Sequence, residues 1–195
     1  MSSGIHIFWI LSRGTGIAAI LLSGFSVTAG LLSGRNMPFA RLKKTTELRP
    51  LHEALSLATI VLVAVHGLLL LGDTWLQPGL AGISIPFVMS YRPFWTGLGI
   101  IAAYGLVALG LSYYLRRWIG PGRWRVAHRF IALFWLLGLA HTFGAGTDAS
   151  QPWLLGAVIL TSGPALILLI VRLGIRHGRQ PVGTVPGRSG AAARP

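Results

Sequence analysis

The chain has 195 residues, of which 53% are hydrophobic and 11% are charged, and its mean hydropathy is +0.66. Soluble domains usually carry about a quarter charged residues, so this composition excludes an ordinary soluble protein. Lys and Arg number 17 against 4 Asp and Glu, which gives a net charge of +13. The basic residues lie between long apolar runs, which favours membrane-flanking charge over nucleic-acid binding. The lack of cysteine excludes disulfides, thiolate haem ligation, iron–sulfur clusters and Cys-based zinc sites.

Five segments are long and apolar enough to cross a membrane, which takes roughly 20 residues. In chain order they are 5–32, 51–71, 94–115, 126–143 and 153–171. The first lacks the basic start of a cleavable signal peptide, so we expect it to remain in the protein. The sequence therefore predicts an all-α integral membrane protein built as a five-helix transmembrane bundle.

The basic residues are distributed unevenly among the connections. Most lie after the first span, after the third span and in the C-terminal tail. By the positive-inside rule these parts are cytoplasmic, which predicts a cytoplasmic C-terminus and, with five helices, an outside N-terminus. High Arg, Gly and Ala with little Lys favours a bacterial source, so the expected location is the plasma (inner) membrane.

Residues 1–177 are interpreted as one transmembrane domain, and residues 178–195 as a disordered basic cytoplasmic tail without apolar periodicity. The tail is too short for a flavin or nicotinamide domain, and no G-x-G-x-x-G fingerprint follows a strand. The loop at 72–93 is expected either to lie in the membrane interface or cap the outer face of the bundle, or to be a plain connection.

Four of the six histidines lie in the second and fourth predicted helices, where ionisable groups are costly and indicate function. The step from His52 to His66 is close to four helical turns, about 21 Å, so these two share one face. The step from His128 to His141 is shorter by a single position. Because both helices cross in the same direction, His52 pairs with His128 at an inner level and His66 with His141 at an outer level.

Two levels with two imidazoles each predict two stacked b-type haems whose irons take these four histidines as axial ligands. The shorter spacing places His128 and His141 on different faces. Both can therefore reach haems only if their helix deviates from ideal winding, at Gly138 or through a π-bulge, or if the two rings approach the haems differently. Histidines that only hydrogen-bond between helices, or that bind a metal ion such as zinc, are the alternatives. His6 and His177 lie outside the pattern.

Arg13 lies about two turns into the first helix, where a charge needs a partner. A propionate of the outer haem would provide one through a charge-assisted pair. The alternative is that the side chain snorkels to the outer headgroups.

Several stretches resemble the ferric reductase-like transmembrane domain family, which includes NADPH oxidases, ferric reductases and the haem subunit of the bacterial methionine-sulfoxide reductase system. They read WILSRGTGIAAILL, LHEALSLATIVLVAVHGLLL, IPFVMSYRPFWTGLG and WRVAHRFIALFWLLGLAHTF. The resemblance covers about residues 5–173 and implies outward transmembrane electron transfer. It matches His52 and His128 to the inner-haem ligands, and His66 and His141 to the outer ones. It also matches Arg13 to an arginine near the outer haem, and implies that the shorter histidine spacing of the fourth helix is usual in the family.

The sequence thus predicts a dihaem membrane cytochrome, an electron-transfer subunit of an oxidoreductase without its own flavin or NADPH domain. Expected donors are a cytoplasmic flavoprotein, which would bring flavin, or a membrane quinol, which would bring quinone. Expected acceptors are an extracytoplasmic protein or ferric ion. A haem-binding sensor or assembly protein, and a histidine-lined metal-ion transporter, are the alternative functions. Membrane lipid is an expected partner and nucleic acid is not.

Overall fold

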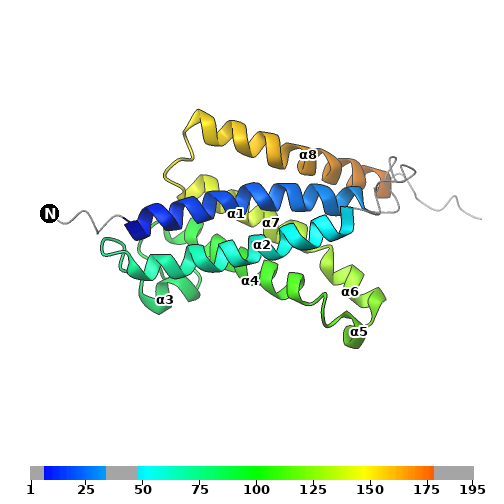
Figure 1. The fold of residues 1–195 in the computed structure, drawn as a ribbon, viewed down its shortest axis with the longest axis horizontal. Coiled ribbons are helices and arrows are strands. Elements are labelled where there is room, and N and C mark those ends of the chain that lie inside the picture. Colours follow the sequence, from blue (N-terminus) through cyan, green and yellow to red (C-terminus); the bar gives the residue numbers. More distant parts are fainter. Residues whose placement is uncertain (1–6, 34–47, 178–195) are drawn as a thin grey trace, which may run out of the picture.

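The computed structural model describes residues 7–33 and 48–177, and this part of the chain contains helices and no strand (Figure 1). Its elements are α1 (Ile7–Leu32), α2 (Leu48–Leu69), η2 (Leu70–Gly72), α3 (Gly79–Ser84), α4 (Pro93–Leu111), α5 (Arg116–Ile119), α6 (Pro121–His128), α7 (Ile131–Ala145) and α8 (Pro152–His177). Five stretches are long and apolar enough to cross a membrane, namely Ile7–Leu32, Leu48–Gly72, Pro93–Leu111, Pro121–Ala145 and Pro152–Gly174. The prediction of an all-helical chain with five candidate spans is confirmed.

The bounds of all five predicted spans differ from the structure by a few residues, and the third and fourth spans differ most in how they are built. The third ends at Leu111, one helical turn earlier than predicted, and turns lead from it to the short helix α5. The fourth consists of two helices, α6 and α7, separated by Arg129 and Phe130. His6, the basic connection 34–47 and the predicted tail 178–195 lie outside the described residues.

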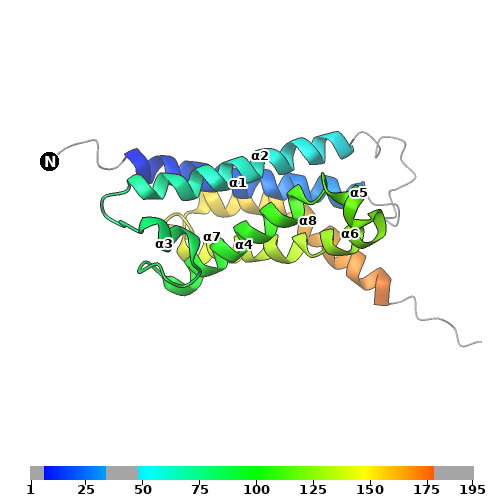
Figure 2. The ribbon, with the colours of Figure 1, turned by 90° about the horizontal axis from the view of Figure 1, so that it is seen from below.

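The helices form two groups that meet at the centre of the bundle. Figures 1 and 2 show α1 lying between α2 and α8, with α4 and α7 packed together on the other side. Small residues allow the close approach within each group. A side chain added at Gly105 or Gly144 on one helix of the α4–α7 pair would collide with Phe134 or Trp95 on the other. Helix α2 therefore faces α7 across the bundle without being packed tightly against it.

The apolar core joins the two groups and lies where α1, α7 and α8 meet. Its buried members are Ile20, Trp135, Leu139, Leu154, Val158 and Ala165. Trp135 and Leu154 are almost completely inaccessible, and each is 1% exposed. Trp135 lies on α7 between the positions of His128 and His141, so the core lies at a depth between the two histidine levels.

The connection between α2 and α4 folds over one end of the bundle. The hydroxyl of Tyr104 on α4 donates to the carbonyl of Ser84 at the end of α3, at 2.7 Å. The Phe87 ring, which follows, lies directly against Gly97 of α4. Phe87 and Arg92 have positive φ angles of 68° and 43°, conformations that are uncommon for residues with side chains. These contacts favour the cap over the plain connection.

The contact between α1 and α8 predicts a specific sensitivity to substitution. At Gly24 an added Cβ would lie 2.7 Å from Oγ of Ser162 and 2.8 Å from the carbonyl of Thr161. The backbone of α8 must move to admit it, so Gly24→Ala should lower stability by about 1–3 kcal/mol. Thermal unfolding of the purified protein in detergent measures this. Gly14→Ala on the same helix is the control, since no atom lies within 4 Å there; equal midpoints would contradict the prediction.

Candidate functional site: two histidine pairs

The structure brings the four predicted histidines together as two pairs across the bundle. The ring centroids of His52 on α2 and His128 on α6 are 6.2 Å apart, with the rings at 82°. Those of His66 on α2 and His141 on α7 are 6.3 Å apart, with the rings at 70°. The pairs are those expected from the helix directions. The two levels are separated by the step from His52 to His66, about 21 Å along the helix axis.

Helix α1 anchors both histidines of α2 in the same way. Nδ1 of His66 donates to the backbone carbonyl of Ser12 at 2.7 Å, and Nδ1 of His52 donates to that of Ser26 at 2.8 Å. The hydroxyl of each serine lies 3.1 Å from the same Nδ1. Each hydroxyl also donates back to the carbonyl of its histidine, at 2.9 Å from Ser12 and 3.4 Å from Ser26. Side chain and backbone are thus held together at both levels.

Two glycines on α1 make room for these rings. A Cβ added at Gly16 would lie 2.9 Å from Nδ1 of His66, and one added at Gly30 would lie 2.9 Å from Cε1 of His52. Each glycine follows an anchoring serine by about one helical turn, so the two lie on one helix face. The imidazoles therefore lie flush against the backbone of α1, in positions that any larger residue would disturb.

The partner histidines are held by α4 and by an aromatic ring. Nδ1 of His141 donates to the carbonyl of Trp95 at 2.9 Å, and a Cβ added at Gly99 would lie 2.6 Å from the same nitrogen. His128 is held differently, since the indole of Trp124 stacks on its ring with centroids 4.9 Å apart and planes at 26°. Three of the four imidazoles thus donate from Nδ1 to a backbone carbonyl of a neighbouring helix.

A local change in winding accommodates the shorter histidine spacing. In an ideal α-helix this spacing leaves His128 and His141 about 140° apart around the axis. At the break between α6 and α7, the amides of Arg129 and Phe130 donate to the carbonyls of Val126 and Ala127, at 3.2 and 3.0 Å. Such tighter winding turns by about 120° per residue and reduces the offset. The predicted deviation thus exists, but at Arg129–Phe130 rather than at Gly138.

The donor atoms fit a metal held from two sides. A neutral imidazole that donates from Nδ1, as those of His52, His66 and His141 do, has its lone pair on Nε2. Histidine ligands typically donate their other N–H to a carbonyl in this way. Nδ1 of the fourth ring, His128, is buried and has no hydrogen-bond partner among the described residues. Two imidazoles with bonds of about 2 Å to one metal between them place their ring centroids roughly 6 Å apart. Both pairs have this separation.

Each pair supplies two ligands and no more. Across residues 7–33 and 48–177, no group of three or more His, Cys, Asp or Glu side chains could hold a metal ion. A small-ion site made by the protein alone requires more ligands than two imidazoles. A haem requires only two axial ligands, since its macrocycle provides the in-plane nitrogens. The donor set therefore fits haem better than a bare ion.

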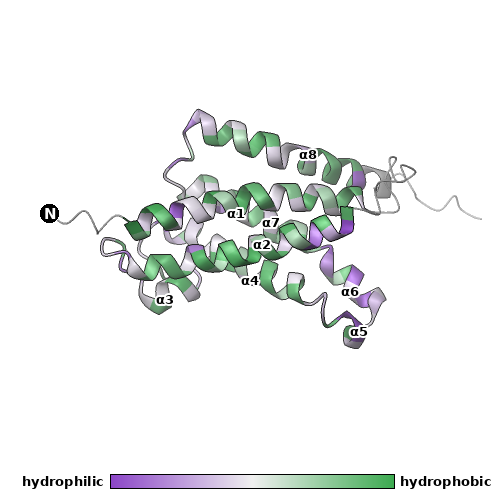
Figure 3. Cartoon of the chain, viewed as in Figure 1, coloured by the Kyte–Doolittle hydropathy of each residue, from purple (hydrophilic) through white to green (hydrophobic). Residues whose placement is uncertain are grey.

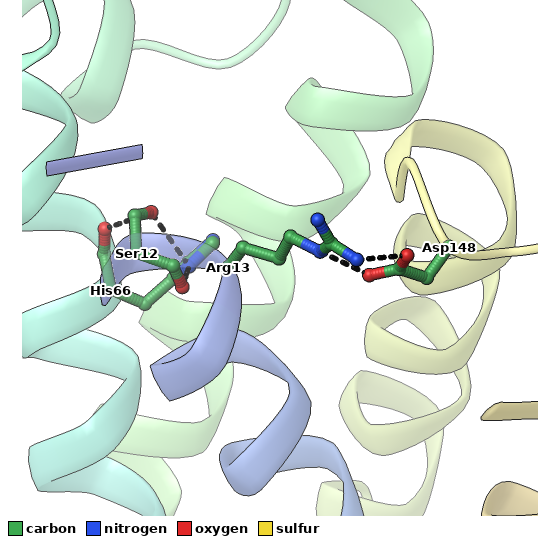
Figure 4. A network of polar contacts seen from close by, with 4 residues as sticks. All are labelled: Ser12, Arg13, His66 and Asp148. Atoms are coloured by element: carbon green, nitrogen blue, oxygen red, sulfur yellow. Dashed lines mark hydrogen bonds and ion pairs between the residues drawn. The ribbon is translucent and has the colours of Figure 1, made fainter. Parts of the chain in front are cut away.

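Arg13 is paired with a protein carboxylate. Its Nε and Nη2 donate to the two oxygens of Asp148, which lies in the connection between α7 and α8 and is buried. Figure 4 shows the neighbouring Ser12 reaching His66 while Arg13 extends away from it to Asp148. The guanidinium also lies 5.0 Å from the ring centroid of Trp9. The sequence suggested a haem propionate or the lipid headgroups as partners and did not identify Asp148.

Sequence reasoning also missed the residues that support the histidines. The spacing of Ser12 and Ser26 equals that of His52 and His66 on α2, and Gly16 and Gly30 repeat it. The repeated pattern S-x-x-x-G on α1 could have identified these residues. Its repeat equals the spacing of the two histidines on α2, so two antiparallel helices would bring a serine and a histidine together at both levels. The chain offers no comparable repeat for the glycine of α4 that contacts His141.

The fold is that of an all-helical multi-pass membrane protein in which four histidines lie in two pairs. The family described as ferric reductase like transmembrane component matches residues 15–139, and the chain belongs to that family. The match contains His52, His66 and His128 and ends just before His141. Proteins of this family generally bind haem and work with redox partners, which suggests transmembrane electron transfer. Comparisons with curated proteins and with solved structures gave no match.

The pairing of Arg13 with Asp148 predicts strong coupling between these side chains. Arg13→Gln or Asp148→Asn leaves the other charge without its partner, so each substitution should lower the thermal unfolding midpoint. The double variant should lose less stability than the two single variants combined, by about 0.5–3 kcal/mol, because it removes both charges. A double-mutant cycle in detergent measures the coupling. Strictly additive losses would show that the ion pair contributes nothing.

Proposed function

We propose that the chain is a dihaem b-type membrane cytochrome that carries electrons from a cytoplasmic or quinol donor to an extracytoplasmic acceptor. The observation that carries this proposal is the repeated geometry of the histidines. Two pairs with ring centroids 6.2 and 6.3 Å apart lie at two levels. The chain belongs to a family that generally binds haem, which supports the same assignment.

Each level has its own set of residues for holding one haem. His52 and His128 would bind one iron, and His66 and His141 the other, in each case through Nε2. Bound haem would supply a reversible one-electron couple, and the protein would supply ligation, orientation and dielectric. Arg13 would lie at the His66 level, where its Nη1, which is not used by Asp148, remains available for an anionic group.

An apolar core lies at a depth between the two levels. Its members Trp135 and Leu139 fall on α7 between the positions of His128 and His141, and they pack against α1 and α8. Apolar surroundings of this kind lower the local dielectric. Such an interior would let the two sites exchange electrons while it limits the leakage of protons and ions.

The charges support an orientation for this transfer. Figure 3 shows hydrophilic residues concentrated on α5, α6 and the start of α2, at the end of the bundle that holds His52 and His128. By the positive-inside rule this end faces the cytoplasm, so the His66 level is the outer one and the C-terminus is inside. Electrons would then pass from the inner level to the outer one. The plasma membrane of a bacterium remains the expected location.

Replacement of one outer ligand gives the most direct test. His66→Ala should reduce the haem content of purified protein from two per chain to one and block transfer across liposomes, because one of the two residues that would hold the outer haem is removed. Haem is counted by the pyridine haemochrome assay. Electron transfer is measured as the reduction of an acceptor that is confined to the outside of a vesicle loaded with reductant. His6→Ala, outside both pairs, is the control. Well-folded wild-type protein without haem would refute the proposal.

The serines should tune the two haems independently. Ser12→Ala removes the hydroxyl near Nδ1 of His66, and Ser26→Ala removes the one near Nδ1 of His52. Groups that bond the far nitrogen of a ligating imidazole alter its basicity and hence the metal's properties. Each substitution should therefore shift the midpoint potential of one haem and leave the other unchanged in a redox titration. Each variant controls for the other; equal shifts of both haems in either variant would contradict the prediction.

A further inference from the structure

A series of aromatic rings in contact with one another leads from the His128 imidazole to the inner surface of the protein. Trp124 stacks on His128 with ring centroids 4.9 Å apart, and Tyr113 contacts Trp124 at 5.7 Å. Tyr114, whose side chain is exposed, follows at 5.4 Å from Tyr113. Nε1 of Trp124 donates to Oγ of Ser112 at 3.2 Å, which fixes the indole. Successive rings thus lie in contact from the ligand to the surface.

Arginines lie around the surface end of this series of rings. The Arg116 guanidinium lies over the Tyr113 ring, 3.8 Å from its centroid. Arg117, Arg123 and Arg125 are exposed on the same two short helices, α5 and α6. Within residues 48–177 none of these four has a carboxylate partner. We call Arg116, Arg117, Arg123 and Arg125 the α5–α6 arginine cluster.

We propose that the α5–α6 arginine cluster docks the electron donor, a soluble one-electron carrier protein with an acidic face, and that Tyr113 and Trp124 form the contact between that donor and His128. This inference rests on the proposed function. Unpaired arginines attract and orient an acidic partner, which raises its association rate and makes binding sensitive to salt. The Tyr113 ring lies against Arg116 of this cluster, so a partner bound by the arginines would lie next to the series of rings.

The chemistry of the surface favours a carrier protein over a quinol. Transfer from a one-electron carrier oxidises its cofactor by one electron and reduces the inner haem by one, with no bond made and no proton moved. A quinol gives up two electrons and two protons, so its site needs a base. Among the described residues, the carboxylate nearest in sequence to an inner ligand is Glu53, and a quinol would have to compete for it with the hydroxyl of Tyr114, which donates to its Oε1 at 3.3 Å.

The docking part is tested by binding. Reduced flavodoxin, an acidic one-electron carrier, is the probe, and the haem-loaded protein is placed in nanodiscs of zwitterionic phosphatidylcholine. The triple variant Arg117→Glu, Arg123→Glu, Arg125→Glu should weaken binding about tenfold or more and abolish its salt dependence. Arg172→Glu is the matched control, because Figure 1 shows α8 on the opposite side of α1 from α5 and α6.

Two outcomes would overturn the docking surface. One is equal binding of flavodoxin by the triple variant and the wild type. The other is that the arginines matter only when anionic phospholipid is present, which would assign them to lipid headgroups. Failure of the proposed function is distinguishable from both, because wild-type protein would then lack haem. If haem is present and dithionite reduces it while flavodoxin does not bind, only the present inference fails.

The aromatic contact is tested by kinetics. Trp124→Leu should slow reduction of the inner haem by bound flavodoxin several-fold, while Trp124→Phe should restore most of the rate. Trp118→Leu is the control, since Trp118 is 75% exposed and lies beside Arg117, 5.2 Å from its guanidinium. The triple arginine variant should not slow reduction by the methyl viologen radical cation, because this cationic reductant needs no docking by arginine.

Trp124 also touches a ligand, so a purely structural role must be separated from a role in transfer. The electron paramagnetic resonance spectrum of the oxidised inner haem reports the orientation of the His128 ring. A lower rate in Trp124→Leu with an unchanged spectrum and unchanged flavodoxin affinity supports the contact. A lower rate accompanied by an altered spectrum, with no rescue by Trp124→Phe, would show that Trp124 only positions His128 and would overturn its role as the path.

Discussion

The antiparallel register of α1 against α2 is the constraint on which the rest of the site depends. The step from Ser12 to Ser26, like that from His52 to His66, is close to four full turns, so each pair returns to almost the same helix face. Ser12 meets His66, and Ser26 meets His52, because the step along one helix equals the step back along the other. A shift of the register by a single position would break both anchors together. The two levels are therefore specified jointly.

The opposite side of the site obeys no such repeat and is built by local means. His141 is anchored by a backbone carbonyl of α4, and His128 by the indole of Trp124. The break at Arg129 and Phe130 lets α6 and α7 present their histidines from separate helices, which a continuous helix with the same spacing would not do. The histidines of α2 are thus held by a repeat on α1, whereas those of α6 and α7 are held by different local contacts. The ring centroids are nearly the same distance apart in both histidine pairs.

Apolar runs and helical periodicity were sufficient to predict the five spans and the pairing of the four histidines, because both depend on segment length and direction alone. The spacing of the histidines predicted a change of winding in the fourth span, but it did not predict where the change would lie. Whether the helix breaks at Gly138 or at Phe130 depends on tertiary packing, which the sequence pattern does not show. Asp148 could not be found from sequence, since it reaches Arg13 only after α7 and α8 have packed. The serine–glycine repeat on α1 was visible and was missed.

The two ends of the bundle use arginine in opposite ways. At the His66 end, Arg13 is neutralised by Asp148, so its charge holds the α7–α8 connection against α1 and contributes little net potential there. At the His52 end, the α5–α6 arginine cluster has no carboxylate partner among the described residues, so its positive potential extends into solvent. Such a potential would attract anionic partners and, in the proposed cytochrome, would stabilise an added electron at the His52 level. Charge placement therefore distinguishes the two ends of the bundle, although the two histidine pairs are nearly identical in geometry.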